Sequence, residues 1–364
     1  MHNVLLAEGG ITSLNIKKRI ILIAVNAVLL LAFIACLIAS GSIKGTLRSQ
    51  QAAKAWAGQS GERFAQLSVF IPDSFVLSEE TLYYLRGSID SALVAASIEE
   101  DEGRTLYTDA WSAEGDVFVL GGRGSATVKA FGVGGDFFLF HPLKLRDGSY
   151  LFPDDLMKDR VLLDEELAWR LFGSVRVAGL EVMIGEKPHI IAGVVSREDD
   201  FASSKAYSYG AGMFMSYESL SEQTAGGARI NCYEVVLPDP ITGFAVSTLT
   251  DTFPDKDAHI IENSARYSLS NIFAAIGSFG ERGMRTDGMI YPYWENAARH
   301  TEDWLALLLV LALVFIVCPV VCGVIYGVKV IRYLSKFVRS TILKRIEERD
   351  AREAEEYLRT GSRE

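Results

Sequence analysis

Two uncharged apolar runs decide how this chain is organised. Residues 20–39 read IILIAVNAVLLLAFIACLIA, and residues 304–328 read WLALLLVLALVFIVCPVVCGVIYGV. A helix of about 20 apolar residues crosses the hydrocarbon core of a bilayer, which is roughly 30 Å thick. Both runs reach that length, so we expect transmembrane helices at residues 20–39 and 304–328. Two spans exclude a wholly soluble protein and argue against a self-sufficient carrier with a substrate site at the bilayer midplane.

Charges outside the two runs predict how the chain is oriented. Lys17, Lys18 and Arg19 directly precede the first run, and six Lys and Arg residues follow the second run before any acidic residue. Residues 41–303 carry 23 Lys plus Arg against 38 Asp plus Glu, a net charge of −15. The positive-inside rule therefore predicts a cytoplasmic lead (1–19), a cytoplasmic tail (329–364) and an extracytoplasmic domain (41–303) of a cell-membrane protein.

Other interpretations of the ends remain open. The first run can also be a signal peptide, or a lipoprotein signal that ends in Phe33–Cys36, although its length and its 19-residue lead favour an anchor. The tail has apolar residues at intervals of four (Leu334, Val338, Ile342 and Ile346), which is typical of a basic amphipathic helix on anionic lipid or on a cytosolic partner.

The central region is predicted to be mixed α+β. Ser78 is positioned to cap a helix, and Gly173 to end one at residues 164–172. Two β-rich runs, residues 117–120 and 127–133, flank a glycine-rich turn. Strand-helix-strand patterns occur near each end of this region, and residues 196–212 are predicted to form an exposed loop.

Motifs for bond chemistry are missing from the sequence. The five His residues are scattered without H-x-x-x-H spacing, no G-x-S-x-G elbow occurs, and no Walker lysine motif is found. The only Cys residue between the runs is Cys232, so no disulfide framework is expected there. A net charge of −10 without a basic stripe argues against nucleic acid. We predict a non-enzymatic chain without a metal or cofactor.

Small and polar residues in the two runs predict helix packing in the bilayer. The candidates are a polar Asn, a Pro and two pairs of small residues at i,i+4 spacing: Asn26, Ala35, Ala39, Pro319, Gly323 and Gly327. The alternative is two passive anchors. Cys318 and Cys322 also share i,i+4 spacing and are interpreted as packing residues. The aromatic residues of 291–294 are predicted to lie at the headgroup level beside the second run.

Six segments between the runs carry a further pattern. They are VGGDFF (133–138), LRDGSYLF (145–152), DEELAWRLFG (164–173), GLEVMIG (179–185), HIIAGVV (189–195) and MFMSY (213–217). In this order, directly after a first span with a cytoplasmic N-terminus, the pattern resembles the periplasmic core domain of MacB-like ABC transporter permeases, which are related to the FtsX permeases. The resemblance extends over residues 20–328.

The resemblance implies an extracytoplasmic α+β domain of two lobes, one built from split strand-helix-strand units and one inserted around residues 134–225. It also implies a domain that binds partners or substrates outside the membrane and relays ATP-driven movement, in dimers that work with a cytoplasmic ATPase. Family permeases typically have four spans, whereas this chain has two and ends 36 residues after the second. The ATPase domain that MacB itself carries is missing from this sequence.

We therefore interpret the chain as a non-enzymatic, two-span subunit of an ABC-type export or mechanotransmission complex. The partners expected are the membrane, a separate ABC ATPase, a further permease subunit and other copies or subunits bound through the spans. The alternative is an orphan membrane-anchored binding or scaffold module without ATP coupling. A third hypothesis, an extracytoplasmic hydrolase, requires Ser, His and Asp to meet in one pocket.

Overall fold

The computed structural model describes the backbone of residues 2–98, 105–207, 209–279 and 289–361. Its internal contacts divide the chain into two units. One unit consists of Met1–Ala39 and Leu308–Glu364, and the other consists of Ser40–Leu307. Two helices, α1 (His2–Thr46) and α10 (Tyr293–Gly361), contribute residues to both units.

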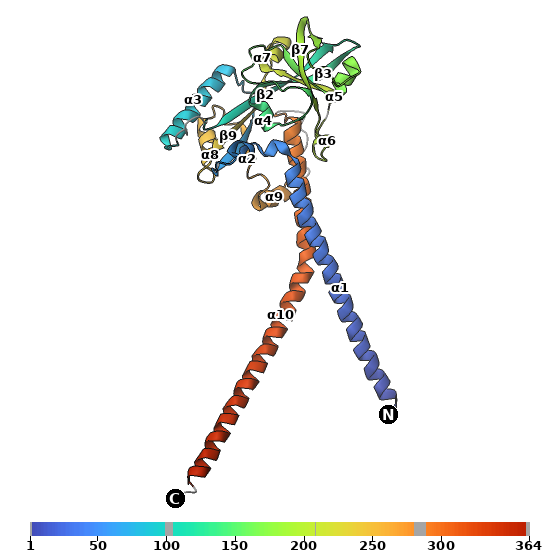
Figure 1. Cartoon of the computed structure of the whole chain (residues 1–364), viewed down its shortest axis with the longest axis vertical. Helices are drawn as coiled ribbons and strands as arrows, with labels where there is room; N and C mark the ends of the chain where they lie inside the picture. Colours follow the sequence, from blue (N-terminus) through green and yellow to red (C-terminus); the bar gives the residue numbers. More distant parts are fainter. Residues whose placement is uncertain (1, 99–104, 208, 280–288, 362–364) are drawn as a thin grey trace. The chain divides into compact units, whose positions relative to one another are not determined.

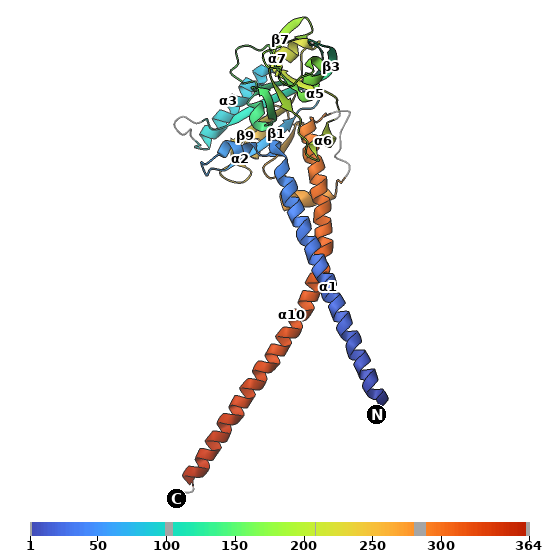
Figure 2. The same ribbon diagram turned by 45° about the vertical axis from the view of Figure 1, so that its right-hand side comes forward.

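The first unit contains the two apolar helical segments. The stretches Lys17–Thr46 of α1 and Tyr293–Asp350 of α10 are long and apolar enough to cross a membrane. Figures 1 and 2 both show α1 and α10 side by side over part of their length. The less exposed positions recur at spacings of three and four, the pattern of a helix-packing seam: Asn26, Leu29, Phe33 and Cys36 in α1, and Ala312, Phe315, Pro319 and Cys322 in α10.

The second unit is built on one sheet of ten strands. Nine of them lie in the order β10-β1-β9-β2-β3-β8-β5-β7-β4, and β6 pairs with β2 and β7. The strands are β1 (Phe64–Phe70), β2 (Thr108–Leu120), β3 (Ser125–Gly135), β4 (Lys144–Gly148), β5 (Arg160–Asp164), β6 (Glu181–Ile184), β7 (Lys187–Ser196), β8 (Gly212–Ser216), β9 (Ile230–Pro238) and β10 (His259–Glu262). The mixed α+β fold between two apolar helices is confirmed, and a single sheet contains all ten of these strands.

Local sequence signals account for several elements. Ser78 accepts a hydrogen bond from the Thr81 amide and caps α3 (Glu79–Ala95), as predicted. Asp164 accepts from the Leu167 amide at the start of α5 (Glu165–Phe172), which ends at Gly173 in the left-handed conformation with φ of 71°. The glycine-rich turn predicted between residues 120 and 125 joins β2 to β3 as an antiparallel hairpin.

The two faces of β1 and β9 bury different kinds of residue. Side chains alternate between the faces of a strand. Leu67 and Val69 of β1, with Tyr233 of β9, lie in a core covered by α3 and α8 (Phe244–Thr252) (Figure 1). The intervening residues include Gln66, Ser68 and Glu234, which are also buried although they are polar. This second face carries the candidate site described below.

A separate core lies in another part of the second unit. It is formed by apolar residues of β2, β3 and β5 to β8 with α5 and α7 (Tyr217–Gln223). Leu167 and Leu171 of α5 and Leu220 of α7 are fully buried in it. A third cluster contains Phe131, Phe137 and other aromatic residues, together with the first turn of α10.

The prediction of an exposed loop at residues 196–212 is wrong. This segment contains the short helix α6 (Ser203–Ala206), and Ala202, Ser203 and Ala206 are buried. The Asp200 carboxylate accepts hydrogen bonds from the Ala202 and Ser203 amides, each at 3.0 Å, and so starts the helix. The acidic residues 198–200 that suggested exposure lead directly into this helix.

Candidate functional site

The six predicted helix-packing residues lie in different environments. Asn26 Nδ2 donates to the Leu22 carbonyl oxygen at 2.8 Å and lies 3.6 Å from Cys322 Sγ, while Asn26 Oδ1 is buried without a partner. Ala39 and Pro319 are half-buried, whereas Ala35 is exposed. Gly323 and Gly327 are exposed as well, and a Cβ added to either would have no atom within 4 Å. The chain thus brings only Asn26 of this set into a polar contact with the other helix.

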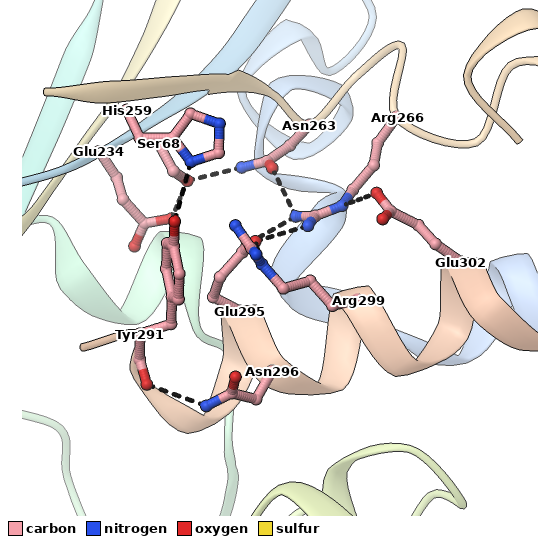
Figure 3. Close-up of polar contacts among 10 residues, drawn as sticks. All are labelled: Ser68, Glu234, His259, Asn263, Arg266, Tyr291, Glu295, Asn296, Arg299 and Glu302. Atoms are coloured by element: carbon pink, nitrogen blue, oxygen red, sulfur yellow. Dashed lines mark hydrogen bonds and ion pairs between the residues drawn. The ribbon is translucent and has the colours of Figure 1, made fainter. Parts of the chain in front are cut away.

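A buried ionic cluster lies at the start of α10 in the second unit. The Arg266 guanidinium donates to both carboxylate oxygens of Glu295, at 2.6 and 2.7 Å. Its Nε donates to Glu302 at 2.5 Å, and Arg299 donates to Glu295 at 2.6 Å. Figure 3 shows Arg266 pointing at the helix that bears Glu295, Arg299 and Glu302. We call these four residues and Asn263, which accepts from Arg266 at 3.3 Å, the α10 anchor.

The charges in the α10 anchor are compensated. Arg266 is 4% exposed and Glu295 is 2% exposed, so each lone charge would carry a large desolvation cost. Burial alone would raise the pKa of Glu295, but the charges of Arg266 and Arg299 outweigh it and hold that pKa below its usual value. Burial likewise opposes the charged form of Arg266, yet Glu295 and Glu302 raise the pKa of this side chain. Both groups are charged at neutral pH.

Hydrogen bonds extend the α10 anchor into the sheet. Asn263 Nδ2 donates to Ser68 Oγ of β1 at 2.7 Å, and Ser68 Oγ donates to Glu234 Oε1 of β9 at 2.8 Å. The other carboxylate oxygen of Glu234 pairs with His141 Nε2, and both residues are buried. Because Glu295 and Ser68 connect through Arg266 and Asn263, the first turns of α10 are linked to two central strands by buried polar contacts.

Aromatic packing holds the same end of α10. The Trp294 ring centroid lies 4.3 Å from that of His141, and the Tyr293 centroid lies 4.4 Å from that of Tyr207. Tyr293 is 4% exposed and Trp294 is 2% exposed. The prediction that the aromatic residues of 291–294 lie at the headgroup level is therefore wrong, because these rings fill the core of the domain.

The arrangement does not resemble a catalytic centre in the part of the chain that the structure describes. Within that part, no group of three or more His, Cys, Asp or Glu residues is placed to hold a metal ion. Ser219 Oγ lies 3.4 Å from His189 Nε2, but His189 Nδ1 faces the Lys187 carbonyl oxygen and Ser219 Oγ donates to the Lys158 carbonyl oxygen. These contacts hold α7 against β7 and against the backbone at Lys158. The charged groups of the α10 anchor are bonded to one another, so they hold a helix to a sheet.

Sequence analysis did not identify the α10 anchor. Gln66 and Ser68 alternate with apolar residues in β1, a pattern typical of a strand with one solvent face. Arg266 and Glu295 are 29 positions apart, so no local pattern connects them. The signal that was present is the Glu295–Arg299–Glu302 spacing, which places three charges along one side of a helix immediately before an apolar run.

Comparison with known families defines the class of this domain. The family model of the MacB-like periplasmic core domain matches residues 34–251. The chain belongs to this family, which confirms the resemblance to MacB-like ABC transporter permeases. The match ends before Asn263, so the α10 anchor lies beyond the matched residues.

Individual proteins and solved structures of this family share 25% of their residues or fewer with the chain over the aligned regions. The macrolide export ATP-binding/permease protein MacB of Aggregatibacter actinomycetemcomitans is 25% identical over 140 residues, which are 37% of this chain and 21% of that protein. The periplasmic region of MacB from Actinobacillus actinomycetemcomitans aligns with a TM-score of 0.39 and 18% identity, covering 55% of this chain and 89% of that region. The extracellular domain of the noncanonic ABC-type transporter YknZ from Gram-positive bacteria aligns with a TM-score of 0.36 and 15% identity, covering 54% and 100%.

Proposed function

We propose that this chain is a non-enzymatic membrane subunit of an ABC-type export or mechanotransmission complex. In this proposal α1 and α10 span the cell membrane, both termini are cytoplasmic, and the MacB-like domain binds a partner or substrate outside. Family membership supports the role. The basic residues that precede the first apolar run and follow the second one support the orientation. A separate ATPase and a further permease subunit complete the assembly.

The observation that carries the proposal is the α10 anchor. A subunit that relays movement needs its membrane helix fixed to the external domain, so that a displacement of one end is not lost in a flexible linker. α10 is one continuous helix from Tyr293 to Gly361, and its first turns are bonded to β1 and β9 through Asn263 and Arg266. Such a link favours a transmitting subunit over a domain on a passive tether.

Co-purification tests this proposal. The tagged full-length chain is extracted from its native membrane in mild detergents, and the eluate is analysed by mass spectrometry. We expect a nucleotide-binding subunit in stoichiometric amount. Recovery of this chain alone, or only with external proteins, in every detergent would favour the orphan binding or scaffold module instead.

A further inference from the structure

The helix α9 (Leu269–Ile276) presents apolar side chains that nothing in the described part of the second unit covers. Leu269 is 73% exposed and Phe273 is 64% exposed, and Phe279 just after the helix is 55% exposed. Residues 269–279 read LSNIFAAIGSF and contain no ionisable side chain. Exposed Leu and Phe side chains clustered on one short segment mark an interaction surface.

The same helix is firmly attached to its own domain. Ile272 and Ala275 are buried, and Ser268 accepts a hydrogen bond from the Asn271 amide at the N-terminus of the helix. Asn271 Nδ2 also donates to the Ala265 carbonyl oxygen at 2.9 Å, next to Arg266 of the α10 anchor. One side of α9 therefore packs on the domain, and the apolar side that carries Leu269 and Phe273 faces outward.

The position of α9 within the second unit indicates what covers it. The chain passes from this unit into its two apolar runs at Ser40 and Leu307. Figures 1 and 2 both show α9 beyond the sheet, at the end of the unit from which α1 and α10 leave it. An apolar helix that lies at the level where two spans begin is placed at a bilayer interface.

A second group of residues supports this placement. Trp304, at the start of the second apolar run, lies 5.3 Å from the Phe201 ring, and Phe201 is 53% exposed. Lys205 Nζ lies 4.2 Å from the same ring. Aromatic side chains accompanied by Lys are enriched at the headgroup level, where the rings contact acyl chains and the ammonium group reaches phosphate.

We infer that α9 is an interfacial helix that rests on the outer leaflet of the bilayer through Leu269, Phe273 and Phe279. The surface it fits is lipid, since the segment has no charge to pair with a polar protein partner and lies where the spans enter the membrane. This inference rests on the proposed topology, in which α1 and α10 cross the bilayer. It adds a lipid contact that holds the domain close to the membrane beside the α10 anchor.

Site-specific fluorescence quenching tests the inference in the full-length chain. Cys36, Cys318 and Cys322 are replaced by Ala, and Cys232 remains because it is fully buried. A thiol fluorophore is attached to Phe273→Cys, and the protein is reconstituted in vesicles of phosphatidylethanolamine and phosphatidylglycerol. The two quenchers are a lipid with a nitroxide near the top of its acyl chain and aqueous iodide.

Two further labels serve as controls. Tyr84→Cys labels an aromatic position of α3 in the same domain that is 64% exposed, and Figure 1 shows α3 beside the sheet, farther than α9 from the point where α1 and α10 leave the unit. Val314→Cys labels the second apolar run, where Val314 is 61% exposed. The Val314 label reports whether the chain crosses the bilayer at all, so failure of the topology is distinguished from failure of the α9 inference.

We expect the Phe273 label to lose fluorescence to the nitroxide lipid and to be shielded from iodide, with the Tyr84 label behaving in the opposite way. Iodide quenching of the Phe273 label as strong as that of the Tyr84 label, while the Val314 label is quenched by lipid, would overturn the inference. Shielding of the Phe273 label from both quenchers would overturn it too, because protein and not lipid would then cover α9.

Discussion

Arg266 is the residue on which the α10 anchor depends. It bonds Glu295 and Glu302 from a fully buried position, so its removal would take the Arg266 charge away from two carboxylates in a low-dielectric environment and leave Glu295 with Arg299. Breaking one side of a buried ion pair costs about 3–5 kcal/mol. We expect Arg266→Met to lower the free energy of unfolding of the full-length chain by about 3 kcal/mol, measured by tryptophan fluorescence in detergent.

A matched control separates burial from charge. Lys187 pairs with Glu222 at 2.5 Å, but both side chains are more than half exposed. Exposed ion pairs contribute little because water screens them, so Lys187→Met should change the unfolding free energy much less than Arg266→Met does. Equal losses in the Arg266 and Lys187 variants would contradict the role given to the α10 anchor.

Glu114 on β2 predicts a pH dependence of stability. Burial, with a smaller contribution from Asp116, raises the pKa of Glu114 to about 7 despite the opposing charge of Lys129. The unfolded chain releases this proton at a lower pH than the folded chain, so ionisation of Glu114 weakens the fold as pH rises from the usual carboxyl range to about 7. Above about pH 7 the destabilisation caused by ionisation of Glu114 has reached its full size.

The variant Glu114→Gln removes this ionisation. Its unfolding temperature should equal that of the parent chain below the ordinary carboxyl pKa and exceed it above pH 7, with the difference growing between those limits. Parallel pH profiles of the two chains would show that the Glu114 pKa is not raised in the folded state.

At the scale of elements, the close approach of β4 and β7 requires glycine. Gly148 and Gly193 pair across these strands, and a Cβ on Gly193 would lie 2.5 Å from the Asp147 carbonyl oxygen. Gly193→Ala should therefore destabilise the chain by about 2 kcal/mol. Gly87, within α3, has open space around it, so Gly87→Ala should stabilise by about 1 kcal/mol through its higher helix propensity. Chemical denaturation measures the unfolding free energy of both variants, which should fall for Gly193→Ala and rise for Gly87→Ala.

The helix α10 carries a prediction about assembly. Gly323 and Gly327 are exposed within this chain, which leaves their surface open to a helix from another chain. We expect α10 to associate with a helix of another chain through this surface. Replacing both glycines by Leu should weaken the association by about 1–2 kcal/mol without lowering the unfolding temperature of the single chain. Val320→Leu, on a neighbouring exposed position, is the control. Sedimentation in detergent measures the association, and unchanged assembly of the Gly variants would remove both residues from the packing interface.

Elements defined by local signals were predictable from sequence, and elements defined by tertiary contact were not. The cap at Ser78, the left-handed Gly173 and the β2–β3 turn depend on neighbouring residues, and the structure confirms each. The order of ten strands in one sheet has no local signature. The aromatic residues Tyr293 and Trp294 were assigned to the membrane because they adjoin an apolar run, whereas their contacts come from residues far along the sequence, among them His141 and Tyr207.

In the candidate site, too, local features were predictable from sequence and tertiary contacts were not. The spacing of small residues in the spans is visible in the sequence, but it does not tell which surfaces face another chain. The α10 anchor joins Ser68, Glu234, Asn263, Arg266 and the start of α10, residues drawn from four separate segments. Charge pairing between such segments is decided by the fold, so a single sequence cannot reveal it.

At the scale of the whole molecule, buried polar bonds join a MacB-like domain to the first turns of α10, a helix long and apolar enough to cross a membrane. The α10 anchor fixes residues 293–307 of α10 to the sheet within the second unit, and the proposed lipid contact of α9 lies in the same unit. A chain built in this way can relay a displacement without carrying out bond chemistry. In the proposed complex, the energy for that displacement comes from the separate ATPase.

The most direct test of the central claim is the rate of ATP hydrolysis by the co-purified nucleotide-binding subunit in vesicles, measured with and without this chain. We expect the rate to change when the full-length chain is added, and to change less when the Arg266→Met chain is added in equal amount. An identical rate in the presence and absence of the chain would contradict the claim that this protein is part of an ATP-driven assembly.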